Sequence, residues 1–171
     1  MNLAILLMKL GTRSMAEKHN LELEEFLRKE GCSAELHELS GTTRTVDEAV
    51  KELGVDRHEI LKTMVMICDE DQPVLAYVLG DRRICHGKLK QALAAKSVRF
   101  ASAEEVLETT GYEVGAVPPV GHRKVLRAVM DREVLNLERV VGGGGKANCL
   151  MSINPKDIVR LVRPQIVDIS E

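Results

Sequence analysis

The sequence has 171 residues, of which 44% are apolar and 29% are charged, as is typical of one soluble globular domain. Its formal net charge of −2 argues against a broad phosphate-binding face and against binding to an anionic membrane. Only four residues are aromatic, too few for a protein that stacks successive bases on aromatic rings.

The first half of the chain is predicted to hold helices and one β-hairpin. Thr45 and Glu48 have the spacing of a capping box, and Gly31 and Gly54 supply helix stops. The expected elements are a helix over residues 15–29, a strand around 34–39, a helix over 46–53, a further turn within 56–61, and apolar strands over 63–68 and 74–79. Residues 1–14 are expected to be an extension ahead of a domain over residues 15–171.

The second half is predicted to alternate helices with short strands. Ser102 and Glu105 form a second capping box, Asp131 can cap a short helix, and Asn154 precedes a proline suited to the first helical position. The expected elements are helices over 86–95, 103–108, 131–135 and 155–161, and strands over 126–130, 140–141, 148–153 and 166–169. The pattern predicts one α+β domain with a mixed or antiparallel sheet.

The four cysteines, Cys32, Cys68, Cys85 and Cys149, form no C-x-x-C pair. This spacing argues against a zinc ribbon or a thioredoxin-type site, so we expect reduced thiols in a cytoplasmic protein, with no metal and no cofactor. No run of 18 apolar residues is present, so we expect no membrane span.

Two glycine-rich segments are candidates for function. The run Gly142–Gly145 precedes a lysine, but Ala147 occupies the Ser/Thr position of a phosphate-binding loop and Val140 the first glycine position. The run therefore indicates either close approach of the backbone to another group or simple turn chemistry. The segment 111–121 holds three glycines and two prolines, and is either a packed connecting loop or a site wall that presents backbone donors.

Lys62 stands at the start of a long apolar strand. Its side chain either extends to solvent or places a fixed positive charge at the edge of a cavity. No G-x-S-x-G motif is present, and no histidine has a Ser or Cys partner in a recognisable motif, so the sequence indicates no side-chain nucleophile.

Four stretches together resemble the YbaK family of aminoacyl-tRNA deacylases, whose domain also occurs as the editing insert of bacterial prolyl-tRNA synthetase. The resemblance extends over about residues 23–169. The stretches that carry it are Thr45–Ala49 with Leu53–Val55, then Ile60–Val65, then Ala101–Val106 leading into Thr-Gly-Tyr-x-x-Gly at 110–115 with Pro119–Gly121, and last Val129–Asp131 with the glycine turn before Ile153–Asp157.

This resemblance implies a compact α+β fold with a barrel-like sheet, and hydrolysis of the ester that joins a wrong amino acid to the 3′-terminal adenosine of tRNA. Lys62 matches the family's essential lysine, and Gly111 belongs to the loop that holds the aminoacyl group, so these two are the expected catalytic residues. The residues expected to bind the substrate are Thr45, Tyr112, Gly115, Pro118, Asp131, Gly143 and Gly144. Many members carry a serine and a basic pair where this chain has Val141 and four glycines.

The resemblance also implies partners. The expected partner is the 3′ acceptor end of an aminoacyl-tRNA, first of all Cys- or Ala-tRNA(Pro), with prolyl-tRNA synthetase as a second partner, and neither DNA nor a membrane. The attacking group is a water, a ribose hydroxyl or the substrate's own side chain. The alternatives are a non-catalytic module that binds charged tRNA or docks on a synthetase, and a hydrolase or binding protein for small molecules.

A cluster of basic residues is the candidate contact with the RNA backbone. Within it, Arg82, Arg83 and Lys88 are the expected tRNA-binding residues, and the cluster is otherwise a solvated surface. Its members are Arg82, Arg83, Lys88, Lys90, Lys96 and Arg99.

Overall fold

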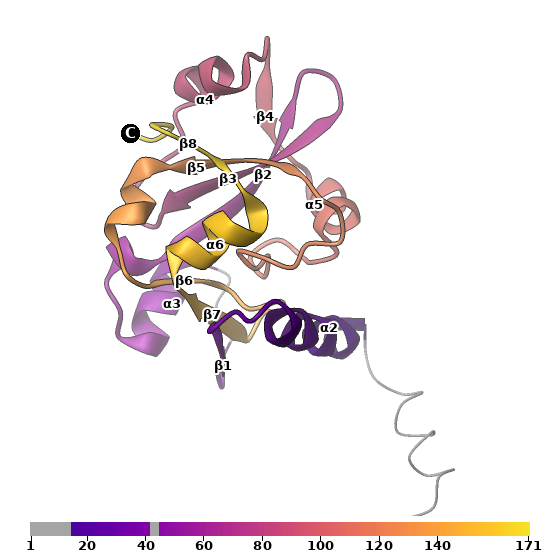
Figure 1. Cartoon of the computed structure of the whole chain (residues 1–171), viewed down its shortest axis with the longest axis vertical. Helices are drawn as coiled ribbons and strands as arrows, with labels where there is room; N and C mark the ends of the chain where they lie inside the picture. The colour runs from indigo at the N-terminus through magenta and orange to yellow at the C-terminus, as the bar shows by residue number, and fades with distance from the viewer. Residues whose placement is uncertain (1–14, 42–44) are drawn as a thin grey trace, which may run out of the picture.

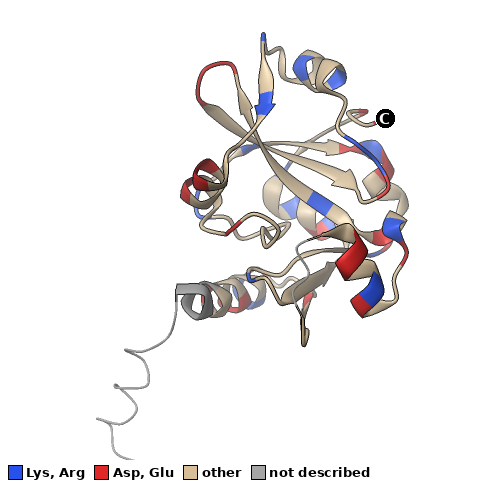
Figure 2. Cartoon of the chain, turned by 180° about the vertical axis from the view of Figure 1, so that it is seen from behind, with Lys and Arg blue, Asp and Glu red and all other residues tan. Residues whose placement is uncertain are grey.

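The computed structural model describes residues 15–41 and 45–171, so the predicted extension over residues 1–14 lies outside the described residues. The described chain is an α+β domain, as predicted, and its strands form two open β-sheets (Figure 1). Views from opposite sides place helix α2 (Met15–Lys29) at the end of the molecule that holds the smaller sheet, and helix α4 (His86–Leu93) at the other end (Figures 1 and 2).

The larger sheet has five strands in the order β4-β2-β3-β5-β8. Its centre is the predicted hairpin, in which β2 (Leu61–Cys68) pairs antiparallel with β3 (Gln72–Leu79). The strands β5 (Arg127–Asp131) and β8 (Gln165–Val167) extend it in parallel, while β4 (Val98–Phe100) pairs antiparallel with the far end of β2. The sheet is therefore mixed, and its inner strands are mostly buried.

The smaller sheet is antiparallel, in the order β1-β7-β6. It consists of β1 (Glu35–Glu38), β7 (Cys149–Ile153) and β6 (Val140–Gly143). A single bridge between Ile60 and Val141 links it to the start of β2. The described strands thus meet at one corner without closing on themselves, and the barrel-like sheet implied by the resemblance is two open sheets.

The helices begin where the sequence predicts and end within two residues of the predicted ends. Capping boxes at Thr45 and Ser102 start α3 (Val46–Leu53) and α5 (Ala103–Thr110), and the side chain of Asn154 caps α6 (Pro155–Val162). The capping hydroxyls and carboxylates satisfy N–H groups that would otherwise lack partners in the first turn. Short 3₁₀ turns, η1 (Arg57–Glu59) and η2 (Arg132–Asn136), follow α3 and β5.

The core lies on both faces of the five-stranded sheet. One cluster packs Leu23 of α2, Tyr77 of β3 and Ile158 of α6 on one face, and a second packs Leu89 of α4 with Met66 of β2 on the other. Tyr77 is fully buried and Tyr112 nearly so, so the core is almost entirely aliphatic. In the described part of the chain, no helix is long and apolar enough to cross a membrane.

Candidate functional site

A cavity of about 480 Å³ lies where the two sheets meet, beside the start of β2. Strand β2, helix α3, strand β6 and the 114–117 segment form its walls, which are mostly apolar. Lys62 is the one charged side chain among the described lining residues. These residues are Thr45, Val46, Ala49, Ile60, Leu61, Lys62, Thr63, Met64, Val65, Phe100, Ala101, Val106, Val114, Gly115, Val117, Val141, Gly142, Gly143 and Leu150.

The structure therefore brings four of the expected site residues to one cavity: Thr45, Lys62, Gly115 and Gly143. Thr45 is also the cap of α3, where its hydroxyl accepts a hydrogen bond from the Glu48 N–H at 3.2 Å. The capping bond fixes this residue at the cavity wall.

Lys62 is half-buried, and its ammonium donates a hydrogen bond to the backbone carbonyl of Arg82. Burial lowers the pKa of Lys62, the Asp81 carboxylate opposes this by raising it, and Arg57 and Arg83 lower it further. An apolar wall with one desolvated cation gives a stronger electrostatic interaction with a bound anion than the same charge in water.

The turn after β3, whose Arg82 carbonyl accepts from Lys62, is stabilised by a contact between Asp81 and His58. Asp81 Oδ2 lies 2.9 Å from His58 Nδ1. Burial acts to raise the pKa of Asp81, but the hydrogen bond and charge of His58 outweigh it and the pKa falls below its usual value. Gly80 packs too closely for any other residue, since a Cβ there would lie 2.5 Å from the Arg57 carbonyl. This tightly packed turn therefore fixes the Arg82 carbonyl that orients the Lys62 ammonium.

The edge of β2 is open where it faces the cavity. Strand β4 pairs with β2 only over Met66–Cys68, and beyond it the Ala101 N–H donates to the Val65 carbonyl at 3.0 Å. Because alternate residues of a strand direct their backbone polar groups to the same edge, the N–H and C=O of Thr63 face the cavity side. No described strand pairs with them there.

Thr63 contributes a second polar group. Its hydroxyl is buried and has no hydrogen-bond partner in the described part of the chain. Thr63 was not among the site residues predicted from the sequence, although a threonine next to Lys62 in an apolar strand was a usable signal. The open strand edge was not visible in the sequence because it depends on where the distant strand β4 stops.

The glycine run of β6 is a close-packed wall. A Cβ at Gly143 would lie 2.5 Å from the Val117 carbonyl, one at Gly142 would lie 2.9 Å from the Pro119 ring, and one at Gly144 would lie 2.6 Å from the Cys149 backbone. Of the two interpretations left open by the sequence, close approach of the backbone to another group is confirmed, and simple turn chemistry is not sufficient. The run lets the 111–121 loop approach the strand closely.

The 111–121 loop is held by side chains from outside it and within it. Tyr77 donates from its hydroxyl to the Pro119 carbonyl at 2.7 Å, and Tyr112 donates to the Gly121 carbonyl at 3.3 Å. Burial raises the pKa of both phenols, that of Tyr112 to about 12, so both stay protonated donors at neutral pH. The loop is thus an ordered wall.

Four further expected site residues, Gly111, Tyr112, Pro118 and Gly144, support this wall but are not among the lining residues of the cavity. Gly111 ends α5 with φ +83° and donates its N–H to the Leu107 carbonyl, while the Gly144 N–H donates to Cys149. The Pro118 carbonyl lies 2.6 Å from the His122 ring, and Tyr112 anchors the loop end. These contacts stabilise the loop and strand segments that carry Gly115 and Gly143.

Asp131 lies away from this lining. It is buried, and both carboxylate oxygens accept backbone hydrogen bonds, Oδ1 from the Glu133 N–H and Oδ2 from the Ile169 N–H, each at 3.0 Å. The predicted cap of the short helix is confirmed. The second bond ties the C-terminal segment to the end of β5.

The basic cluster is partly neutralised. Lys88 pairs with Asp168 at 2.9 Å, and Arg99 forms a bidentate pair with Glu105 at 2.7 and 2.8 Å. The turn between β2 and β3, which is acidic, lies at the same end of the molecule as the basic segments of α4 and β4 (Figure 2). Arg83 and Lys90 remain exposed.

In the portion of the chain that the structure describes, no three His, Cys, Asp or Glu side chains are grouped so that they could hold a metal ion. The four cysteines are free thiols, and burial raises the pKa of Cys149 to about 11.

Comparison with known proteins gives a consistent result. The family model for the aminoacyl-tRNA editing domain matches residues 40–161. The chain is 37% identical over 136 residues to the proline–tRNA ligase of Desulforamulus reducens, covering 78% of this chain and 23% of the ligase. It is 36% identical over 129 residues to the proline–tRNA ligase of Streptococcus pyogenes serotype M1, covering 75% of this chain and 20% of that ligase. The chain thus spans only about a fifth of these relatives.

Solved structures of similar size match along nearly their whole length. One is a hypothetical protein, APE2540, with a TM-score of 0.82 and 35% identity, covering 88% of this chain and 99% of the other. Another is a proposed trans-editing enzyme for prolyl-tRNA synthetase, with a TM-score of 0.81 and 31% identity, covering 90% and 97%.

Proposed function

Because the chain belongs to the aminoacyl-tRNA editing domain family, we propose that it is a deacylase that hydrolyses, in trans, the ester of mischarged tRNA in the cytoplasm. The observation that carries the proposal is the half-buried ammonium of Lys62 at the edge of an apolar cavity, beside the open edge of β2. The similarity to the proposed trans-editing enzyme, at 31% identity and a TM-score of 0.81, supports action in trans.

The apolar cavity suits the side chain of a small amino acid, and its one cation suits the ester carbonyl or the terminal phosphate. In the reaction, the oxygen of a water bonds to the carbonyl carbon, the ester C–O bond breaks, and the ribose oxygen leaves with a proton. The tetrahedral intermediate carries a negative oxygen. Lys62 and the Thr63 N–H are positioned to stabilise it, and one such donor contributes about 10²–10³ in rate.

The described residues that line the cavity include no serine, cysteine or histidine. The lining hydroxyls are those of Thr45, which caps α3, and Thr63, and no histidine or carboxylate among the described lining residues can activate either of them, so the proposed mechanism has no covalent enzyme intermediate. An aminoacyl ester is already activated, so orientation and electrostatic stabilisation suffice for its hydrolysis.

Alanine or cysteine attached to tRNA(Pro) is the proposed substrate. A synthetase pocket discriminates one methylene by only about 1–3 kcal/mol, so small amino acids that enter a prolyl site must be removed at a second site. The relatives that are proline–tRNA ligases support this choice. Prolyl-tRNA synthetase is the proposed partner, and the exposed Arg83 and Lys90 are the proposed contacts with the acceptor stem.

The test is deacylation of a panel of mischarged tRNAs by the wild type and by Lys62→Ala. We expect Lys62→Ala to lower the rate by about 10²–10³ on the preferred substrate. Lys156→Ala, which removes an exposed lysine from α6, is the matched control and should retain full activity. Full activity of Lys62→Ala would refute its role, and binding without turnover across the panel would support the non-catalytic module.

The pH dependence gives a second test. The pKa of Lys62 is lowered from its ordinary value, so activity should fall as alkaline pH removes the proton from the ammonium. Asp81→Asn removes the carboxylate that raises this pKa, so the alkaline limb should move to lower pH. In the folded protein the charged form of Lys62 is disfavoured, so Lys62→Met should unfold at an equal or higher temperature at pH 7 although it is inactive. A lower melting temperature would contradict this.

A further inference from the structure

Phe100 is the one aromatic residue of the chain that is neither buried nor packed against the large core cluster of the described residues. The chain has four aromatic residues. Tyr77 and Tyr112 are buried and anchor the 111–121 loop, and Phe26 packs against the core. Phe100 is 50% exposed and lies on the lining of the cavity.

The register of the sheet places Phe100 on the same face as Lys62. In the β2–β4 pair Phe100 lies opposite Met66, and side chains of directly opposed residues point to the same face. Lys62, Met64 and Met66 are alternate residues of β2, so their side chains share that face. Lys62 lies four residues along β2 from Met66, the residue opposite Phe100. Lys62 and Phe100 are therefore about 13 Å apart along the strand direction, with Met64 between them.

The ring of Phe100 contacts the ring of His86. The ring of His86, at the start of α4, lies with its centroid 5.4 Å from that of Phe100, at an interplanar angle of 61°. The two rings are therefore edge to face and not stacked, so His86 leaves at least one flat face of Phe100 uncovered.

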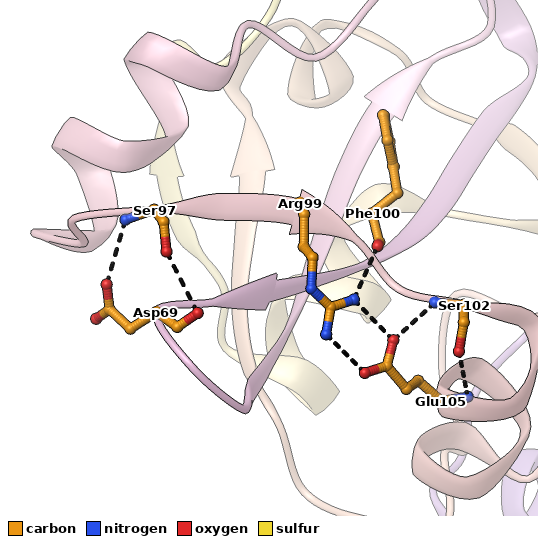
Figure 3. A network of polar contacts seen from close by, with 6 residues as sticks. All are labelled: Asp69, Ser97, Arg99, Phe100, Ser102 and Glu105. Carbon is orange, nitrogen blue, oxygen red and sulfur yellow. Dashed lines mark hydrogen bonds and ion pairs between the residues drawn. The ribbon is translucent and has the colours of Figure 1, made fainter.

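The backbone that carries Phe100 is held by a network of polar contacts (Figure 3). Arg99 donates to the Phe100 carbonyl at 3.2 Å while it pairs with Glu105, and Glu105 accepts from the Ser102 N–H at 2.8 Å. These contacts lower the pKa of Glu105 to about 2, so the network stays charged at neutral pH. At the other end of β4, Ser97 bonds to Asp69.

From this placement we infer that Phe100 is a stacking platform for the terminal adenine of the tRNA, and that it positions the aminoacyl ester beside Lys62. The inference rests on the proposed function and names a base-binding subsite of the same cavity. Stacking on one aromatic ring needs no basic surface, so it is compatible with a protein of net charge −2 that has four aromatic residues. A rigid platform also loses little conformational freedom when the base binds.

The experiment uses tRNA(Pro) that ends in 2-aminopurine and carries alanine through an amide bond that cannot be hydrolysed. Stacking of 2-aminopurine on an aromatic ring quenches its fluorescence. We expect quenching with the wild type, loss of quenching with Phe100→Leu together with a Kd that is about 5- to 150-fold higher, and near-normal behaviour of Phe100→Tyr. Val125→Ala, which alters a fully exposed apolar residue outside this cavity, is the control and should match the wild type.

A second arm measures deacylation of Ala-tRNA(Pro) whose terminal nucleotide lacks its base. The Phe100→Leu substitution should slow hydrolysis of the normal substrate and leave hydrolysis of the base-free substrate unchanged. The inference is overturned if the wild type shows no quenching, if Phe100→Leu quenches normally, or if it slows both substrates equally. If quenching depends on Phe100 but no substrate is hydrolysed, the deacylase activity is refuted and the stacking role of Phe100 is retained. If the substrate is hydrolysed but no quenching occurs, the stacking role is refuted and the deacylase activity is retained.

Discussion

Two glycine-rich segments face each other at the wall of the cavity, and they contain glycine for different reasons. In the 111–121 loop, Gly111, Gly115 and Gly121 adopt φ values of +83°, +84° and +80°, which favour glycine. In β6, Gly142 and Gly143 have no such φ values but leave no room for a Cβ. At Gly111 glycine is needed for conformation, and at Gly142 and Gly143 it is needed for space. Substitutions at these positions should therefore differ in their cost to stability and in which residue restores it.

The largest effect is expected at Gly143. A Cβ there would overlap the Val117 carbonyl and the Ala116 backbone, neither of which can rotate away. Gly143→Ala should lower the free energy of unfolding by about 3 kcal/mol, at the upper end for overpacking, and should reduce deacylation because the loop wall is displaced. Chemical denaturation measures the first effect and single-turnover hydrolysis the second. An unchanged denaturation midpoint would show that the two segments are not in rigid contact.

Acid should act on the loop through His122. Burial lowers the pKa of His122 to about 4, opposed by its contact with the Pro118 carbonyl. The unfolded chain binds this proton near pH 6.5, so the folding equilibrium constant should fall by up to tenfold per pH unit between about pH 6.5 and 4. Thermal melting across this range, with His122→Gln, tests the idea, because the variant should lose this slope.

The matched control is His86→Gln, which alters an exposed histidine. It should leave the acid slope as in the wild type. A slope that persists in His122→Gln would place the titrating group elsewhere.

At Gly111 the cost should be conformational. A Cβ there would meet only the flexible Arg123 side chain at 3.4 Å, so the penalty of Gly111→Ala comes from the left-handed φ, about 1–2 kcal/mol. Gly111→Asn should be tolerated better than Gly111→Ala, because asparagine adopts this conformation more readily. The opposite order at Gly111, or a similar rescue by asparagine at Gly143, would break the distinction between the two segments.

The sequence predicted what depends on neighbours along the chain. Capping boxes at Thr45 and Ser102, the β2–β3 hairpin and the Asn154 cap were all correctly placed because their signals lie within a few residues. Strand β4 was missed, since three residues at the edge of a sheet carry almost no pattern of their own.

The features that depend on tertiary contacts were not predictable. The basic cluster was predicted to contact RNA or to form a solvated surface, yet Asp168, eighty residues away from Lys88, forms an ion pair with that lysine. The open edge of β2 at Thr63 follows from the length of β4, and the spatial need for glycine at Gly143 follows from a loop in another part of the sequence. Lys62 could be selected from the sequence, but the carbonyl that orients it could not.

The smallest effect is expected at a glycine that serves neither purpose. Gly87 lies in α4 without a left-handed φ, and a Cβ there would meet nothing closer than the Cys85 sulfur at 4.0 Å. Gly87→Ala should therefore raise the free energy of unfolding by up to about 1 kcal/mol, because alanine reduces the freedom of the unfolded chain and favours the helix. Chemical denaturation of Gly87→Ala, Gly111→Ala and Gly143→Ala under the same conditions compares the three free energies of unfolding directly. A loss of stability at Gly87 would mean that glycine is required in this fold for a reason other than conformation or space.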